Sequence, residues 1–164
     1  MRIIGIDPGL ATTGIGLVEH DEHGEIRCLD WCTVTTPAGQ ATSDRLRELS
    51  QDLRGILEEW KPSLAVVERI FFSVNERTAI DVAQARGVIL MTLAQQAIPL
   101  LEPTPPQLKS CITGDGSADK RQIQDMLLRM FKLPSVPTPD DAADALALAV
   151  FGALHKKGVR VSTG

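Results

Sequence analysis

The chain is poor in the residues that mark several specialised classes of protein. Its 164 residues include three cysteines, an odd number without the spacing of a disulfide scaffold. The longest strongly apolar stretch, residues 145–154, is too short to span a bilayer, and no signal-like apolar region follows Met1. We therefore expect a cytoplasmic protein without membrane contact. The length suits a single domain over residues 1–164 with a sizeable core.

The sequence also lacks an excess of basic residues. Its formal net charge is -4, which argues against nonspecific binding of polyanions by the whole surface. A local basic patch can still form a nucleic-acid site, and a cluster of catalytic carboxylates would itself make the total negative. Aromatic residues are scarce too, with no tyrosine and four phenylalanines, so the adjacent pair Phe71 and Phe72 stands out.

Two apolar runs that each end in a carboxylate organise the chain. Residues 3–7 indicate a buried strand that ends at Asp7, where a Pro-Gly pair turns the backbone. Residues 64–68 repeat this pattern and end at Glu68. A right-handed crossover would place the second run parallel to the first. As neighbours, the two strands would bring both carboxylates to one edge of the sheet.

The remaining patterns complete an α/β fold with a five-stranded mixed sheet flanked by helices. The first three strands should form an antiparallel meander, followed by a helix, the strand 64–68, and then mostly helices. We expect helix caps at Thr42 or Ser43 and at Ser117. The other expected strands are 14–19, 26–35 and 98–102, and the expected helices are 43–60, 76–97, a short one from 105, 118–131 and 139–151.

The expected helix over residues 76–97 has apolar residues on more of its surface than one sheet can cover. This pattern favours a second apolar face that contacts a partner subunit, with Leu90 as an outward position. The alternative is a helix enclosed within one domain.

The last helix holds a carboxylate that a capping role does not explain. Asp140 and Asp141 suit a first helical turn. Asp144 lies one turn further, among residues that must face the core, and no basic residue lies three or four positions from it. Because an unpaired buried carboxylate costs several kcal/mol, Asp144 should need a cation.

Two strand-end carboxylates and two on one helix face make a set of hard oxygen ligands: Asp7, Glu68, Asp141 and Asp144. Such a set favours Mg²⁺, with Mn²⁺ as a substitute, over zinc. Two ions in one site can act together on a phosphodiester. Lys109 and Lys120 would contact the phosphate. The predicted reaction is hydrolysis of a phosphodiester in a nucleic acid.

Five segments, in order along nearly the whole chain, together resemble the RuvC family of Holliday-junction resolvases. They are Ile4-Gly5-Ile6-Asp7-Pro8-Gly9, Val67-Glu68, Gln84-Ala85-Arg86-Gly87, Gly116-Ser117-Ala118-Asp119-Lys120 and Asp141-Ala142-Ala143-Asp144-Ala145-Leu146. The resemblance implies an RNase H-like fold, a homodimer, and Mg²⁺-dependent nicking of two symmetric strands of a four-way DNA junction in recombination and repair. It also implies a branch-migration helicase partner of the RuvA–RuvB type.

The resemblance further implies roles for single residues. Phe71 matches the aromatic that stacks on the junction, and Phe72 is the alternative for that role. Asp141 matches the third metal ligand, with the adjacent Asp140 as the alternative. The implied ligand set is Asp7, Glu68, Asp141 and Asp144, and the implied basic DNA contacts are Arg69, Arg77, Lys109 and Lys120, of which Lys120 is also expected to be catalytic.

Three other functions fit parts of the sequence. Nucleotide-binding ATPases and sugar kinases of a related fold also begin with an Asp-x-Gly turn, but they need a second domain half and a second glycine-rich turn, for which this chain lacks room. A catalytically inert DNA-binding module would not need all four carboxylates. An RNase H-like nuclease on RNA-containing substrates fits the carboxylates, whereas the loop aromatics and the apolar helix favour junction DNA.

Overall fold

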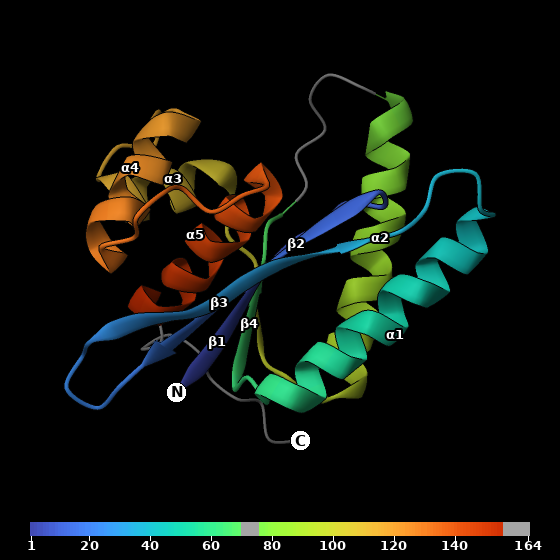
Figure 1. The fold of residues 1–164 in the computed structure, drawn as a ribbon, viewed down its shortest axis with the longest axis horizontal. Coiled ribbons are helices and arrows are strands. Elements are labelled where there is room, and N and C mark those ends of the chain that lie inside the picture. The colour runs from blue at the N-terminus through green and yellow to red at the C-terminus, as the bar shows by residue number, and fades with distance from the viewer. Residues whose placement is uncertain (70–75, 156–164) are drawn as a thin grey trace.

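The computed structural model describes residues 1–69 and 76–155, with the backbone alone for residues 76–78. A five-stranded mixed sheet lies between two layers of helices (Figure 1). In sheet order, the strands are β3 (Ile26–Thr35), β2 (Thr12–His20), β1 (Arg2–Asp7), β4 (Leu64–Val67) and β5 (Leu100–Leu101). The helices are α1 (Thr42–Trp60), α2 (Glu76–Gln95), α3 (Pro105–Thr113), α4 (Lys120–Phe131) and α5 (Asp140–His155). Within these residues, no helix is long and apolar enough to cross a bilayer.

The two carboxylate-ending strands are neighbours, as predicted. β1 runs antiparallel to β2 and parallel to β4, and Ile6 of β1 lies opposite Val67 of β4. The residue that follows each of these two is a predicted site residue: Asp7, the last residue of β1, or Glu68, directly after β4. Both residues therefore leave the sheet at the same edge.

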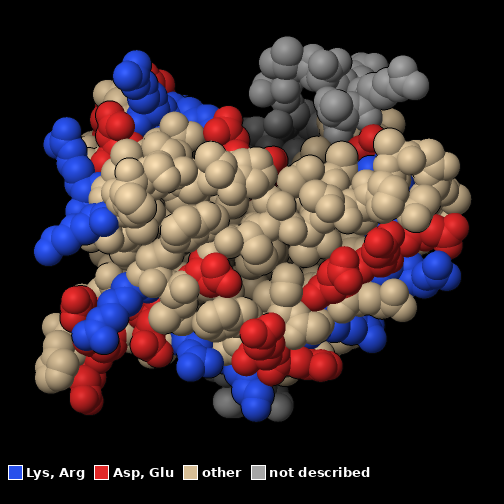
Figure 2. Space-filling view, viewed as in Figure 1, with Lys and Arg blue, Asp and Glu red and all other residues tan. Residues whose placement is uncertain are grey.

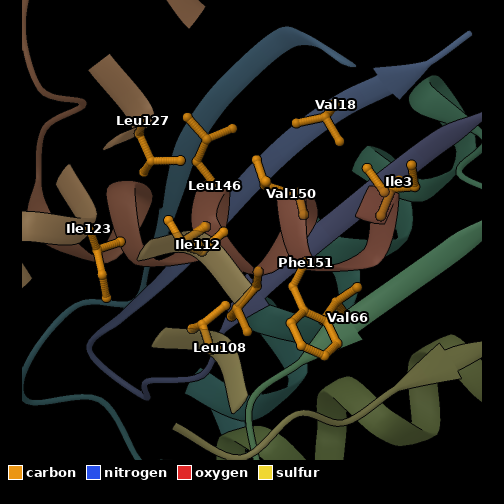
Figure 3. Close-up of a cluster of buried hydrophobic side chains, with 14 of the residues drawn as sticks. Ile3, Val18, Val66, Leu108, Ile112, Ile123, Leu127, Leu146, Val150 and Phe151 are labelled. Carbon is orange, nitrogen blue, oxygen red and sulfur yellow. The ribbon is translucent and has the colours of Figure 1, made fainter. Parts of the chain in front are cut away.

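Each face of the sheet has its own hydrophobic core. Helices α1 and α2 cover one face, and α3, α4 and α5 cover the other. Figure 3 shows the second core, where side chains from three strands meet those of the three helices. Its labelled members are Ile3, Val18, Val66, Leu108, Ile112, Ile123, Leu127, Leu146, Val150 and Phe151.

Glycines in the central strands let α5 lie directly against the sheet. A Cβ atom on Gly14 would collide with the carbonyl oxygen of Asp141, and one on Gly5 would collide with that of Ala145. Side chains at these positions would push the helix away. The glycines therefore set the approach of α5, and with it the position of Asp144 relative to β1.

Two predicted caps are wrong. Helix α1 begins after Ala41, whose carbonyl oxygen accepts backbone N–H groups of the first turn, and no side chain caps the helix. Helix α4 begins after Asp119, which forms a capping box with Gln122. The Asp-x-x-Gln spacing satisfies two backbone N–H groups reciprocally, whereas Ser117 donates to the carboxylate of Asp115.

The predicted outward position on α2 is also wrong. Leu90 is half-buried and packs on the core formed with α1. The helix buries Ala85, Ile89 and Leu93, and Leu90 lies at the flank of that stripe.

Candidate active site

Three carboxylates from distant parts of the chain line one cavity of about 280 Å³. Asp7 ends β1, Glu68 directly follows β4, and Asp144 lies in the second turn of α5. Lys109 of α3 and Lys120 of α4 complete the charged lining, and the other walls are apolar. The structure thus brings together five residues that the sequence had suggested for one site.

Asp7 is strongly affected by its surroundings. Its carboxyl is half-buried, and its pKa is raised to about 7. Burial is the largest cause, followed by the negative charges of Asp144, Glu68 and Asp141. The ammonium of Lys120 lowers this pKa in part. Without a further cation, Asp7 is therefore only partly ionised near neutral pH.

Glu68 shares this environment. Burial raises the pKa of its carboxyl, and repulsion from Asp144 raises it further, whereas the positive charge of Lys109 lowers it. Among the described side chains, those of residues 1–69 and 79–155, none forms a hydrogen bond or ion pair with the carboxylate of Glu68 or that of Asp7. Toward this part of the chain, both carboxylates are available to accept a cation.

Asp144 is not unpaired, which corrects the premise drawn from its sequence neighbours. Its Oδ2 accepts a hydrogen bond from Nζ of Lys120 at 2.9 Å. Its side chain is 36% exposed, so it is also less buried than the flanking apolar residues indicated. Burial still raises the pKa of Asp144, and the bond to Lys120 offsets part of that effect. Lys120 is brought close by packing between α4 and α5.

The charges of Asp140 and Asp141 act on different groups. The exposed carboxylate of Asp140 lies 3.3 Å from Nζ of Lys120. Burial lowers the pKa of that ammonium, but its bonds to Asp144 and Asp140 outweigh burial and raise it. Asp141 is half-buried and does not line the cavity, yet its charge raises the pKa of Asp7 and of Asp144. Asp141 therefore acts on the carboxylate cluster, and Asp140 on the lysine.

The donor set fits a hard divalent cation, although the ligands are not fully assembled. Among the described residues, no three carboxylate, imidazole or thiol groups lie close enough together to surround an ion as they stand. Burial is the first cause of the raised pKa values of Asp7, Glu68 and Asp144, and repulsion from neighbouring carboxylates adds to it, so a cation bound here would favour the ionised forms. Buried carboxylates without nitrogen or sulfur donors are the ligands that Mg²⁺ and Mn²⁺ prefer.

The predicted DNA-contacting loop is described only at its edges. Phe71 and Phe72 lie outside the described residues, as does the side chain of Arg77. Arg69 is exposed, and its backbone N–H donates to the carbonyl oxygen of Pro103 at 2.9 Å. Arg69 is not among the residues that line the cavity.

Sequence reasoning missed one residue beside the site. Nε of Arg86, on α2, donates a hydrogen bond to the carbonyl oxygen of Glu68 at 3.0 Å. The same guanidinium contacts the carboxylate of Glu102, just after β5. The only available signal was that Arg86 falls within one of the segments that carry the family resemblance.

Comparisons with known proteins identify the family to which the chain belongs. A family model described as "Crossover junction endodeoxyribonuclease RuvC" matches residues 3–152. RuvC of Chloroflexus aggregans is 50% identical over 150 residues, which cover 92% of this chain and 91% of the relative. RuvC of Syntrophomonas wolfei is 46% identical over 163 residues, covering 99% of this chain and 92% of the relative.

Solved structures confirm the predicted RNase H-like fold with its five-stranded mixed sheet. Thermus thermophilus RuvC, solved in complex with a Holliday junction substrate, has a TM-score of 0.88 and 28% identity, covering 96% of this chain and 95% of that chain. The yeast mitochondrial Holliday junction resolvase has a TM-score of 0.65 at 16% identity, covers 92% of this chain and 78% of that chain, and shares the fold. The family model and the curated relatives place this chain in the RuvC family of crossover junction endodeoxyribonucleases.

Proposed function

We propose that this chain is a structure-selective endonuclease that resolves four-way DNA junctions by hydrolysing two symmetric phosphodiesters. The observation that carries the proposal is the convergence of Asp7, Glu68 and Asp144 on one cavity that Lys109 and Lys120 also line. This arrangement occurs in a chain of the RuvC family, one of whose members was solved with a Holliday junction substrate. The family favours this function over a nucleotide-binding kinase, an inert DNA-binding module, or a nuclease on RNA-containing substrates.

Divalent cations, Mg²⁺ with Mn²⁺ as a substitute, are the proposed cofactor, with up to two per site. Asp7, Glu68 and Asp144 would hold them, with Asp141 as the fourth ligand because its charge already acts on Asp7 and Asp144. Bound cations of this kind activate a water molecule and stabilise the leaving oxygen of a phosphodiester. The carboxylates would lose their bound protons on loading, because a nearby positive charge favours the ionised form.

Lys120 is proposed to change partners when the site is loaded. Its ammonium now holds Oδ2 of Asp144 at 2.9 Å and lies 3.3 Å from Asp140. A divalent cation on Asp144 would repel this ammonium, whereas Asp140 could retain it at the cavity entrance. There Lys120, together with Lys109 of the same cavity lining, would contact the phosphate of the cleaved strand. Asp140 thus has a proposed role that does not require it to bind metal.

A homodimer formed through α2 is the proposed assembly. The face of α2 opposite its buried stripe carries exposed apolar or small residues at helical spacing, namely Ile80, Ala83, Gly87, Met91 and Ala94. A mid-helix glycine costs about 1 kcal/mol relative to alanine, and no atom of the described chain would contact a Cβ at Gly87. A closely packed second helix would account for both the exposed apolar residues and the glycine at position 87. A two-fold dimer would present two equal sites to a nearly two-fold junction.

The remaining DNA contacts and the helicase partner stay predictions. Phe71 or Phe72 would stack on an unpaired base, and Arg69 and Arg77 would contact phosphates beside them. A branch-migration complex of the RuvA–RuvB type is implied by the family resemblance alone. Co-sedimentation of the purified proteins on a junction tests that partner.

The deciding experiment uses a synthetic four-way junction with a mobile core, incubated with the purified chain and Mg²⁺. We expect paired nicks at symmetric positions, and none in the presence of a chelator. The Asp7→Asn variant should bind the junction without cutting it, because phosphate contacts remain while one ligand charge is lost. Equal cutting of a linear duplex of the same sequence, or preferential cutting of an RNA–DNA hybrid, would refute the proposed function.

A further inference from the structure

We propose that Arg86 is a positioning residue, which fixes Glu68 through a hydrogen bond to its main chain and so sets the geometry of the carboxylate cluster. This inference rests on the proposed function, because it concerns a residue assigned there as a cation ligand. Arg86 itself is not among the residues that line the cavity, and the proposed function assigns it no role.

Strand pairing ends just before Glu68. In the described chain, β4 pairs with β1 up to Val67 and with β5 up to Val66. Beyond that point, two other bonds hold the peptide that joins Glu68 to Arg69. Its N–H, from Arg69, donates to the carbonyl oxygen of Pro103 at 2.9 Å, and its carbonyl oxygen, from Glu68, accepts a hydrogen bond from Nε of Arg86 at 3.0 Å.

A second contact holds the guanidinium in place. Nη2 of Arg86 donates to the carboxylate of Glu102, which directly follows β5. The Arg86 side chain is 15% exposed, so its charge needs this partner. Because a guanidinium is planar, its two bonds have a fixed relative direction. Arg86 consequently ties α2 to the ends of β4 and β5 at once.

This tie controls the position of one ligand relative to the others. Asp7 and Asp144 are held by β1 and α5, which do not depend on Arg86. A rotation of the main chain at Glu68 would therefore move its carboxylate alone, away from the shared cavity. Groups that orient a metal ligand typically change metal affinity or activity by about 10- to 100-fold when they are removed.

The first test replaces Arg86 with glutamine and, separately, with lysine. We expect Arg86→Gln to bind Mn²⁺ about tenfold more weakly in isothermal titration calorimetry without DNA. Junction cleavage at saturating DNA should fall by about 10- to 100-fold, with the Kd for the junction unchanged. Arg86→Lys keeps the charge but not the planar pair of donors, so it should recover part of both losses.

A matched control separates positioning from general stability. Thr92 is fully buried on the same helix, and its hydroxyl bonds to that of Ser50 on α1 at 3.0 Å. Thr92→Val should lower the free energy of unfolding but leave the Mn²⁺ affinity and the cleavage rate per folded molecule unchanged. If Arg86 merely stabilised the fold, its variants would behave in the same way.

A measurement without metal or substrate completes the design. The backbone N–H of Arg69, one residue after Glu68, is bonded to Pro103 at 2.9 Å. We expect this amide to exchange its hydrogen faster in Arg86→Gln than in the native chain, and at the native rate in Thr92→Val.

The outcomes keep the two proposals apart. If the native chain does not cut junctions, the proposed function fails. The positioning role can still be tested in that case: it is overturned if Arg86→Gln leaves the Mn²⁺ affinity unchanged and does not speed hydrogen exchange at the Arg69 amide. If the native chain cuts junctions and Arg86→Gln matches Thr92→Val in Mn²⁺ affinity, cleavage rate and amide exchange, the positioning role of Arg86 is wrong and the proposed function stands.

Discussion

Replacing Asp7 with asparagine should stabilise the metal-free protein, although it removes a residue of the proposed active site. The pKa of Asp7 rises from 3.8 to about 7 in the folded protein, first because of burial and then because of the surrounding carboxylates. A pKa difference of one corresponds to about 1.4 kcal/mol. The ionised carboxylate therefore costs the folded state about 4 kcal/mol, which an asparagine of similar size does not incur.

The pH dependence of this effect follows from the direction of the shift. Below pH 3.8 the carboxyl is protonated in both the folded and the unfolded chain, so Asp7 and its asparagine variant should be similarly stable. As the pH rises from 3.8 to about 7, the unfolded chain releases the proton first, and the native protein loses stability relative to the variant. Above about 7 both states are ionised, and the difference levels off.

Urea unfolding in the presence of a chelator, at several pH values from about 4 to 8, measures the difference directly. Asp52→Asn, at an exposed position of α1, is the matched control and should show no comparable change. Saturating Mg²⁺ should reverse the order, because the native site gains binding free energy that the variant lacks. A difference that does not vary with pH, or a variant less stable than the native chain at pH 8, would refute the described environment of Asp7.

Four further substitutions test other parts of the structure. Gly14→Ala should lower the free energy of unfolding by about 1–3 kcal/mol, because a Cβ there collides with the backbone of α5. Gly55→Ala, in open space on α1, should instead raise it by about 0.5–1 kcal/mol in the same chemical denaturation assay. Met91→Glu should convert the proposed dimer into monomer in multi-angle light scattering, and a stable dimer would reject the α2 interface. Lys120→Met should tighten Mn²⁺ binding severalfold, since the ammonium competes for Asp144, yet slow junction cleavage. Weaker Mn²⁺ binding in titration calorimetry would contradict that competition.

The sheet could be predicted because its signals are local and repeated. An apolar run that ends in a carboxylate occurs twice, and the rule for right-handed crossovers then places β4 beside β1. That step located Asp7 and Glu68 at one edge from the strand–helix–strand order alone, without knowledge of how the helices pack. The helix starts at Ala41 and Asp119 were missed for a different reason. At each start, several nearby side-chain and backbone oxygens can accept a hydrogen bond from the same N–H groups, and the sequence does not show which of them does.

The environment of Asp144 could not be read from the sequence, because it depends on packing between distant elements. Its partner Lys120 precedes it by 24 residues and belongs to another helix, so no i±3 or i±4 spacing connects the two. The orientation of Leu90 could not be predicted from the sequence either. A wide apolar arc on α2 indicates that two faces are needed, but only the packed structure shows that Met91 points outward while Leu90 covers the core.

The charge distribution explains how a chain with a net charge of -4 can accept a polyanion. Figure 2 shows basic side chains projecting at the edge that carries α4, and a row of acidic side chains along α1. Exposed Arg121 and Arg129 on α4 lie on the same helix as Lys120, which lines the cavity. The carboxylate cluster lines the same cavity as Lys120. Because that cluster would repel phosphate until divalent cations neutralise it, the proposed function predicts that DNA affinity at this site and metal loading are coupled in both directions.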